Sequence, residues 1–258
     1  MVRKIHQFDN GIKVYDDHLI DAQRERYRHN NIHEPEEEEI FRRLLEEIPA
    51  DGCFLNIGAA IGYYALLAKK LAPDLEIHAV EPLLRHREFF LENIALNDLD
   101  KTGFVIHTEG ISTREGQTDL IDHGYGSSLA RPGGGLPGQV RSASLKSRYK
   151  TLRRKIWPRR SEVTQTVVTV TLEKMIAVIG RPVDLCQMDI QGFERDVLKS
   201  SETLLHKDHI INFLIGTHSQ EVHEGCVKIL QSSGYRILHD NYETADQPDG
   251  ILVARKAD

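Results

Sequence analysis

A glycine-containing turn joins a short apolar run to a helical pattern near residue 60. Residues 56–64 read Asn-Ile-Gly-Ala-Ala-Ile-Gly-Tyr-Tyr, between the apolar run 53–55 and the helical pattern 66–71. Such a turn lets the backbone approach a ligand and directs helix N–H groups towards it. It therefore predicts a pocket at the carboxyl end of the first strand of an α/β sheet, and the pattern favours a nucleoside as the ligand.

The spacing of the glycines narrows the class of nucleoside. A dinucleotide fingerprint requires G-x-G-x-x-G, but its second and third glycine positions, counted from Gly58, are Ala60 and Tyr63. Glu81 follows the next apolar run, nineteen residues after Gly62, where a carboxylate would bind a ribose diol. Both cofactor classes use that carboxylate, so the glycine spacing decides. It favours S-adenosylmethionine over a nicotinamide, which remains the alternative.

Composition places the chain among ordinary globular proteins. Its 258 residues are 40% hydrophobic, which suffices for one large domain, and no apolar stretch approaches the roughly 20 residues of a membrane span. The N-terminus is polar and lacks a signal sequence, so we expect a soluble, cytoplasmic protein. Cys53, Cys186 and Cys226 lie far apart without a C-x-x-C pair and are interpreted as buried free thiols.

The net charge of −6 hides a basic segment. Residues 131–160 carry ten lysines and arginines and no acidic residue, which leaves about −16 on the rest of the chain. The segment belongs to a Gly- and Pro-rich insertion, 123–162, which we interpret as a lid over an anionic or glycan acceptor. A solvated loop is the simpler alternative. Nucleic acid is disfavoured because the segment offers few aromatic side chains for stacking.

Hydrophobic periodicity divides the chain into an N-terminal extension, 1–50, and an α/β domain, 51–258. In the extension, Ile40, Leu44, Leu45 and Ile48 predict a helix over 36–48, and the acidic run 34–39 is interpreted as its start. Strands are predicted at 53–57, 76–80, 103–108, 117–121, 163–170, 183–188, 210–215, 235–239 and 251–254. Helices are predicted at 61–71, 85–97, 172–179, 192–205 and 221–233.

From about residue 52 to 254 the chain resembles the FkbM-type S-adenosylmethionine-dependent methyltransferases. The resemblance rests on the segments 56–64, 80–82, 92–97, 126–128, 170–173 and 188–194, which occur in the family's order. It implies a Rossmann-like class I fold: a seven-stranded, mostly parallel sheet with helices on both faces, a helical cap and a lid-like insertion. It also implies methyl transfer from S-adenosylmethionine to a hydroxyl of a sugar, glycan or small natural product.

Three positions depart from the family pattern. Asn56 stands where the family usually has Asp, Gln187 where it has Lys, and Gln191 where it has Glu. An amide still accepts hydrogen bonds but gives up attraction to a cationic ligand, which is worth about 1–3 kcal/mol for a charge-assisted bond. A nucleoside-binding protein of the same fold that has lost turnover is therefore the alternative function.

The predicted cofactor contacts gather around the first two strand ends and the loop after the third. For Gly110 and Ile111, in the loop after the third strand, an ordinary loop without a ligand is an equally good interpretation. Asn97 is interpreted as a helix cap. The predicted contacts are Asn56, Gly58, Ala59, Gly62, Tyr63, Glu81, Gly110 and Ile111.

The predicted acceptor chemistry involves two neighbouring strand ends. Asp189 follows an apolar strand, and His218 follows the next one, where ligands of open α/β sheets bind. A histidine that titrates near neutrality suits removal of a hydroxyl proton. Alternatively, Asp189 and His218 hold a divalent metal that acidifies the hydroxyl. Glu194 reaches the substrate, or caps the next helix together with Gln191.

Overall fold

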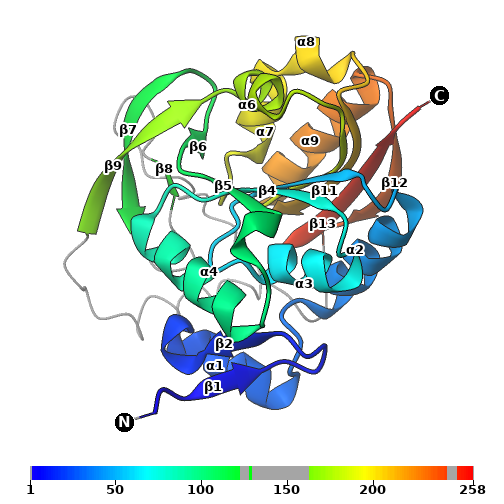
Figure 1. Ribbon diagram of the computed structural model, residues 1–258. Helices are drawn as coiled ribbons and strands as arrows, with labels where there is room; N and C mark the ends of the chain where they lie inside the picture. Colours follow the sequence, from blue (N-terminus) through cyan, green and yellow to red (C-terminus); the bar gives the residue numbers. More distant parts are fainter. Residues whose placement is uncertain (1, 123–127, 130–162, 243–248, 258) are drawn as a thin grey trace.

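The computed structural model describes residues 2–122, 128–129, 163–242 and 249–257. Most of the predicted lid, 123–162, its ten basic residues, and Gly126 and Ser127 lie outside this part of the chain. A seven-stranded sheet forms the centre, in the order β12-β13-β11-β10-β3-β4-β5 (Figure 1). Its strands are β3 (Cys53–Ile57), β4 (Glu76–Val80), β5 (Phe104–His107), β10 (Val183–Met188), β11 (Ile210–Thr217), β12 (Tyr235–Asn241) and β13 (Gly250–Lys256).

The sheet is mostly parallel, as predicted. β11, β10, β3, β4 and β5 pair in parallel, and β13 runs antiparallel to both β11 and β12, which confirms the terminal hairpin. β3 and β10 are buried and mostly apolar, and their predicted bounds match. All parallel strands end at one edge, so this edge receives the glycine turn, Asp189 and His218.

Helices cover both faces of the sheet (Figure 1). One core cluster joins the sheet to α2 (Pro35–Glu47), α3 (Tyr63–Leu71) and α4 (Leu84–Leu96) through Phe41, Leu66 and Phe90. A second lies on the opposite face, under α6 (Leu172–Ile179), α7 (Glu194–Ser200), α8 (Glu202–Leu205) and α9 (Gln220–Ser232). The single helix predicted over 192–205 is divided into α7 and α8, which meet at the buried Ser201.

A separate four-stranded sheet follows β5. Its order is β6-β9-β7-β8, from β6 (Gly110–Ile111), β7 (Gly116–Asp122), β8 (Ser128–Leu129) and β9 (Val163–Val170). The strands predicted at 117–121 and 163–170 are confirmed, but they pair with each other outside the central sheet. Their antiparallel ladder of seven residue pairs satisfies the backbone locally, and Leu120 and Val167 pack with Leu83 and Phe193.

The N-terminal extension is less helical than predicted. It begins with a hairpin of β1 (Ile5–Gln7) and β2 (Lys13–Tyr15), followed by the short helix η1 (Asp16–His18), α1 (Asp21–His29) and the predicted helix α2. Figure 1 places the hairpin and α1 below α3 and α4. Phe8, Val14 and Phe41 enter the same core as the central sheet, so the extension is built into the domain rather than folded beside it.

Asn93 and Asn97 of the 92–97 motif attach the hairpin to the domain. Asn97 caps α4, as predicted, and exchanges two hydrogen bonds with the Lys13 backbone: Lys13 N donates to Oδ1 at 2.9 Å and Nδ2 donates to Lys13 O at 2.6 Å. Asn93 Nδ2 donates to Ile61 O of the glycine turn at 3.1 Å, while its Oδ1 lies 3.1 Å from His18 Nδ1. The motif therefore links the extension to the glycine turn.

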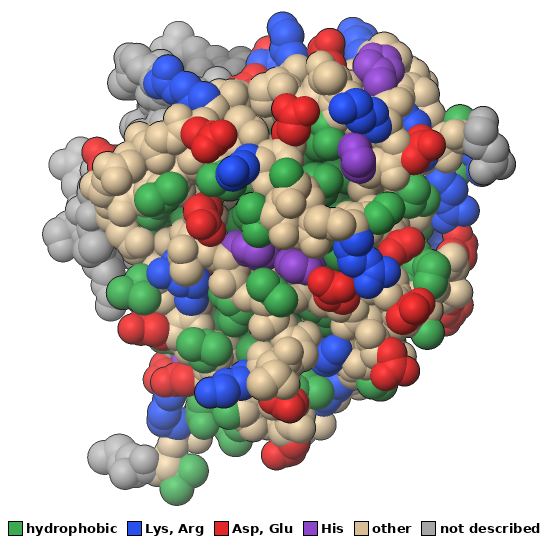
Figure 2. Space-filling view, turned by 45° about the horizontal axis from the view of Figure 1, so that its top comes forward, with side chains coloured by type: hydrophobic (Ala, Val, Ile, Leu, Met, Phe, Trp, Pro, Cys, Tyr) green, Lys and Arg blue, Asp and Glu red, His purple; other side chains and the backbone are tan. Residues whose placement is uncertain are grey.

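The surface seen in Figure 2 is mixed in character. Basic, acidic and histidine side chains alternate there with scattered hydrophobic ones. Cys53, Cys186 and Cys226 are buried free thiols, which confirms that prediction. Within the described ranges, every helix is too short or too polar to cross a membrane.

Candidate functional site

The glycine turn between β3 and α3 is held by close approaches that only glycine permits. Gly58 has φ +84°, and a Cβ there would lie 2.0 Å from the backbone oxygen of Asp189. Gly62 has φ +89° and precedes the first residue of α3; its Cβ would lie 2.0 Å from the ring of Phe90. The turn is thus pressed against the end of β10 on one side and α4 on the other, which fixes its shape.

Glu81, at the end of β4, supports the turn directly. Its side chain is buried, its Oε2 accepts a hydrogen bond from Ala60 N at 2.8 Å, and its Oε1 accepts one from Leu83 N at 2.8 Å. His86 Nδ1 lies 3.6 Å from Oε1. An ionised carboxylate has about four acceptor positions, so two backbone donors leave capacity for a ribose diol. Glu81 therefore stabilises the glycine turn and retains acceptor positions for its predicted role.

The first two departures from the family pattern, Asn56 and Gln187, are in direct contact. Asn56 and Gln187 are neighbours across β3 and β10, and Asn56 Nδ2 donates to Gln187 Oε1 at 2.8 Å. Gln187 Nε2 donates in turn to Glu37 Oε1 of α2 at 2.8 Å. Asn56 Oδ1 is buried and has no hydrogen-bond partner in the described part of the chain. A ligand with a donor group would satisfy it, which fits the predicted cofactor contact.

The remaining predicted contacts lie in different places. Ala59 is buried within the turn. Tyr63 is the first residue of α3. Its hydroxyl donates a hydrogen bond to Glu38 and accepts one from Asn10 Nδ2 of the extension. Gly110 and Ile111 form the buried strand β6, paired with β9. The structure therefore brings Asn56, Gly58 and Glu81 together, whereas the hydroxyl of Tyr63 is used to hold the extension.

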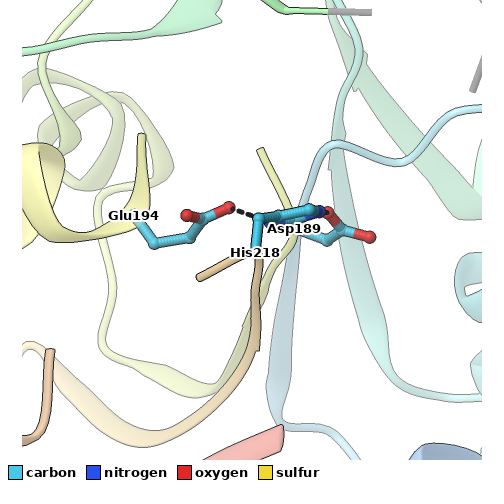
Figure 3. A group of neighbouring side chains, drawn as sticks. All are labelled: Asp189, Glu194 and His218. Atoms are coloured by element: carbon cyan, nitrogen blue, oxygen red, sulfur yellow. Dashed lines mark hydrogen bonds and ion pairs between the residues drawn. The ribbon is translucent and has the colours of Figure 1, made fainter. Parts of the chain in front are cut away.

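Asp189 and His218 meet at the carboxyl ends of β10 and β11, as predicted. Figure 3 shows His218 between two carboxylates, with Glu194 of α7 on one side and Asp189 on the other. Its Nδ1 lies 3.1 Å from Glu194 Oε1, and its Nε2 lies 3.3 Å from Asp189 Oδ1. Nε2 also lies 3.7 Å from Asp249 Oδ1, and it is buried without a well-aligned hydrogen bond to any described residue.

Glu194 orients the imidazole. It is fully buried, and its Oε1 also accepts hydrogen bonds from Ile190 N at 3.0 Å and Gly192 N at 3.1 Å. The predicted capping pair is wrong in its details, because Phe193 is the N-cap of α7 and Gln191 precedes it with φ +58°. Gln191 Nε2 instead donates to Asp189 Oδ1 at 3.2 Å. Glu194 thus has a positioning contact with His218 that the sequence pattern did not distinguish from a cap.

The neighbouring charges shift the pKa values of His218 and Asp189. Burial alone would lower the pKa of His218, but the Glu194 and Asp189 carboxylates outweigh it and raise the pKa well above its ordinary value of 6.5. Burial would raise the pKa of Asp189, yet the charge of His218 and its hydrogen bonds lower it. The charge of His218 and that of Asp189 therefore favour each other.

Asp189 and His218, together with Glu194, are also the candidate ligands of the predicted metal site. One ligand atom each from Asp189, Glu194 and His218 lies within 4.8 Å of the others, so the set could hold a divalent cation. Each nitrogen of the single imidazole already faces a carboxylate, however, and a cation would have to replace one of those contacts. The geometry suits an oriented histidine more directly than a metal centre.

Residues of the extension border this centre, and the sequence interpretation missed them. Glu34 and Glu37 of the acidic run are buried, and Tyr64 of α3 donates to Glu34 Oε2 at 3.3 Å. Glu38 is buried as well and pairs with Arg42. Helical spacing in the sequence indicates this burial, because the three glutamates share one helical face with apolar residues of α2. The positions on that face are 34, 37, 38, 41, 44 and 45.

Comparisons with known proteins agree with this arrangement. The model of the methyltransferase FkbM domain matches residues 56–237. The methyltransferase sdnD of Sordaria araneosa is 24% identical over 227 residues, covering 83% of this chain and 85% of that protein. The methyltransferase FkbM from Methylobacillus flagellatus KT shares the fold with a TM-score of 0.50 and 12% identity, over 80% of this chain but only 44% of that one. Through residues 56–237, from the glycine turn to the start of β12, this chain belongs to the FkbM methyltransferase domain family.

Proposed function

We propose that this protein uses S-adenosylmethionine to methylate a hydroxyl group of a sugar, glycan or small natural product, with His218 as the general base. The observation that carries the proposal is His218, held through Nδ1 by the buried Glu194 while Nε2 lacks an aligned partner among the described residues. Removal of a hydroxyl proton requires a base that is oriented through one nitrogen and accepts the proton at the other. The acceptor hydroxyl would replace the contact of Nε2 with Asp189.

The residues around the turn fit the cofactor. Gly58 and Gly62 keep the turn free of side chains, the Glu81 carboxylate ends the second strand, and the buried Asn56 Oδ1 lacks a donor within the described residues. When bound, S-adenosylmethionine supplies an electrophilic methyl group on a positively charged sulfur. Asn56, Gly58 and Glu81 would hold it, and Ala59, Gly110 and Ile111 remain predicted contacts.

The proton follows a defined route. During transfer of the methyl group to the acceptor oxygen, His218 Nε2 would accept the hydroxyl proton. The resulting imidazolium is stabilised by Glu194 and Asp189, the same carboxylates that raise the pKa of His218. His218 must be neutral before the reaction, and a positive charge bound nearby favours this state because like charges lower its pKa.

Two other predictions are weighed here. A metal at Asp189, Glu194 and His218 would acidify the hydroxyl in place of a base, and a chelator distinguishes the two, because only a metal-dependent rate falls on its addition. The lid and its anionic acceptor stay predictions, since 130–162 lies outside the described residues. The described surroundings of Asp189 are acidic and do not favour an anion at this point.

The test is methyl transfer from labelled S-adenosylmethionine to a panel of sugars, glycolipids and phenols. Transfer by the wild type that His218→Ala lowers by about 10²–10⁴-fold would support the proposed base. Cofactor binding without transfer to any acceptor would favour the inert nucleoside-binding protein instead. An unbiased metabolite mixture as the acceptor source would identify the substrate class.

A further inference from the structure

Two buried carboxylates at the start of α2, Glu34 at its N-cap and Glu37 in its first turn, have no lysine or arginine within salt-bridge distance in the described part of the chain. Glu37 is 3% exposed and accepts only the amide of Gln187, at 2.8 Å. Glu34 is 8% exposed and meets Tyr64 at 3.3 Å and His33 at 3.8 Å. Burial and the charge of Arg26 lower the pKa of His33 to about 3, so this imidazole is neutral and supplies no charge.

The carboxylates lie against the proposed cofactor site. Glu37 is connected to Asn56, on the strand that leads into the glycine turn, through Gln187. The charge of Asp189 acts on both, and with burial it raises the pKa of Glu34 to about 7 and that of Glu37 well above its ordinary value. Glu38, their neighbour on the helix, is paired with Arg42 at 2.8 Å and is set apart from this cluster.

A second observation points to a ligand with donor groups. Asn56 is 3% exposed, and its Oδ1 has no hydrogen-bond partner among the described residues although its Nδ2 is satisfied by Gln187. A buried acceptor left unpaired costs about 1–3 kcal/mol, which a bound donor would recover. The charge of Arg26 acts on Glu34 only from beyond salt-bridge distance. The two buried carboxylates and the unpaired amide oxygen therefore both favour a ligand with positively charged donor groups.

We infer that Glu34 and Glu37 of the N-terminal extension select the positively charged methyl donor over its neutral-sulfur product. The inference rests on the proposed function and adds to it a role for the extension. Transfer removes the positive charge of the sulfonium, so a carboxylate near the site stabilises the donor more than the product. The extension would thereby favour release of the product and reduce inhibition by it.

The experiment compares affinities rather than rates. Calorimetric titrations of S-adenosylmethionine and S-adenosylhomocysteine into the wild type, Glu34→Gln and Glu37→Gln give the ratio of the two dissociation constants. We expect each substitution to weaken donor binding by about 5- to 20-fold and product binding by less than about 2-fold, as loss of one charge-assisted contact implies. Glu39→Gln, which removes an exposed charge from the same helix, should leave both affinities unchanged.

The outcomes separate this inference from the proposed function. If the wild type binds neither ligand, the proposed function fails as well. If the wild type binds both and the substitutions weaken both equally, or neither, the two carboxylates are structural and this inference alone is wrong. A third probe needs no variant: an analogue with a protonated amine in place of the sulfonium should bind the wild type more tightly than the product. Equal affinities would contradict the inference.

Discussion

His218 must lose a proton before it can accept one, so the pH dependence of the rate is a test at the scale of single residues. Glu194 and Asp189 hold its pKa well above 6.5, and the rate should therefore rise with pH through and beyond neutrality. Glu194→Gln keeps an acceptor for Ile190 N but removes one negative charge. The rising limb of kcat against pH should move to lower pH in this variant.

Stability gives an independent check on the same histidine. A raised pKa in the folded state contributes stability that is fully present below about pH 6.5, the unfolded value. That contribution is lost as pH rises through the folded pKa. Thermal unfolding of wild type and His218→Gln should differ most at pH 6 and converge in alkaline buffer. A difference that does not change with pH would contradict the ion-paired state.

Gly58 tests whether close approach or backbone conformation shapes the cofactor turn. Gly58 and Gly180 both have positive φ, +84° and +75°, but an added Cβ meets nothing within 4 Å at Gly180 and the Asp189 oxygen at 2.0 Å at Gly58. Gly180→Ala should cost about 1 kcal/mol of unfolding free energy. Gly58→Ala should cost about 3 kcal/mol or more and abolish cofactor binding. Equal losses in denaturant unfolding would show that the contact with β10 is unimportant.

At the scale of elements, α2 and its N-cap residue Glu34 bring buried carboxylates to the site, and their ionisation lowers the stability of the folded state. Because burial and Asp189 raise the pKa of Glu34 from 4.5 to about 7, ionising it costs the folded state stability as pH rises through this window. Glu34→Gln should match the wild type near pH 4 and exceed it by about 1–3 kcal/mol above pH 7. Glu39→Gln, exposed on the same helix, is the control and should change little. A variant less stable than the wild type at pH 8 would contradict this interpretation.

The elements also show what local sequence can and cannot predict. β3, β9, β10 and α6 have the predicted bounds because their local patterns are clear: β3 and β10 are mostly apolar, β9 is rich in β-branched residues, and α6 is an amphipathic helix. The hairpin β1–β2 was not predicted, since its two three-residue strands depend on Asn93 and Asn97, about 80 residues away. Local periodicity carries no information on such distant partners.

Some features of the candidate site could likewise be predicted from the sequence, and others could not. Asp189 and His218 could be predicted together because parallel strands end at one edge of the sheet. The orientation of His218 by Glu194 and the approach of Glu34 and Glu37 depend on how α7 and α2 pack in three dimensions. A charged run such as 34–39 resembles a solvated helix start until the helix is docked.

At the scale of the whole molecule, the extension and the α/β domain share one core and jointly surround the cofactor turn. Tyr63 joins α3 to Glu38 of α2, and Asn93 joins α4 to both the turn and the hairpin. Removal of the extension would expose Phe54 and Tyr64, which are buried in that core against the ring of Phe41. Ligand binding is best measured on the full chain.

Calorimetric titration of the full chain with S-adenosylmethionine, and separately with NAD, tests the proposed cofactor most directly. We expect saturable binding of S-adenosylmethionine at one site and no binding of NAD, because Ala60 and Tyr63 replace two glycines of the dinucleotide fingerprint. Glu81→Gln should weaken the binding by about 1–3 kcal/mol while the fold is retained. Binding of NAD by a folded sample that does not bind S-adenosylmethionine at millimolar concentration would contradict the proposed function.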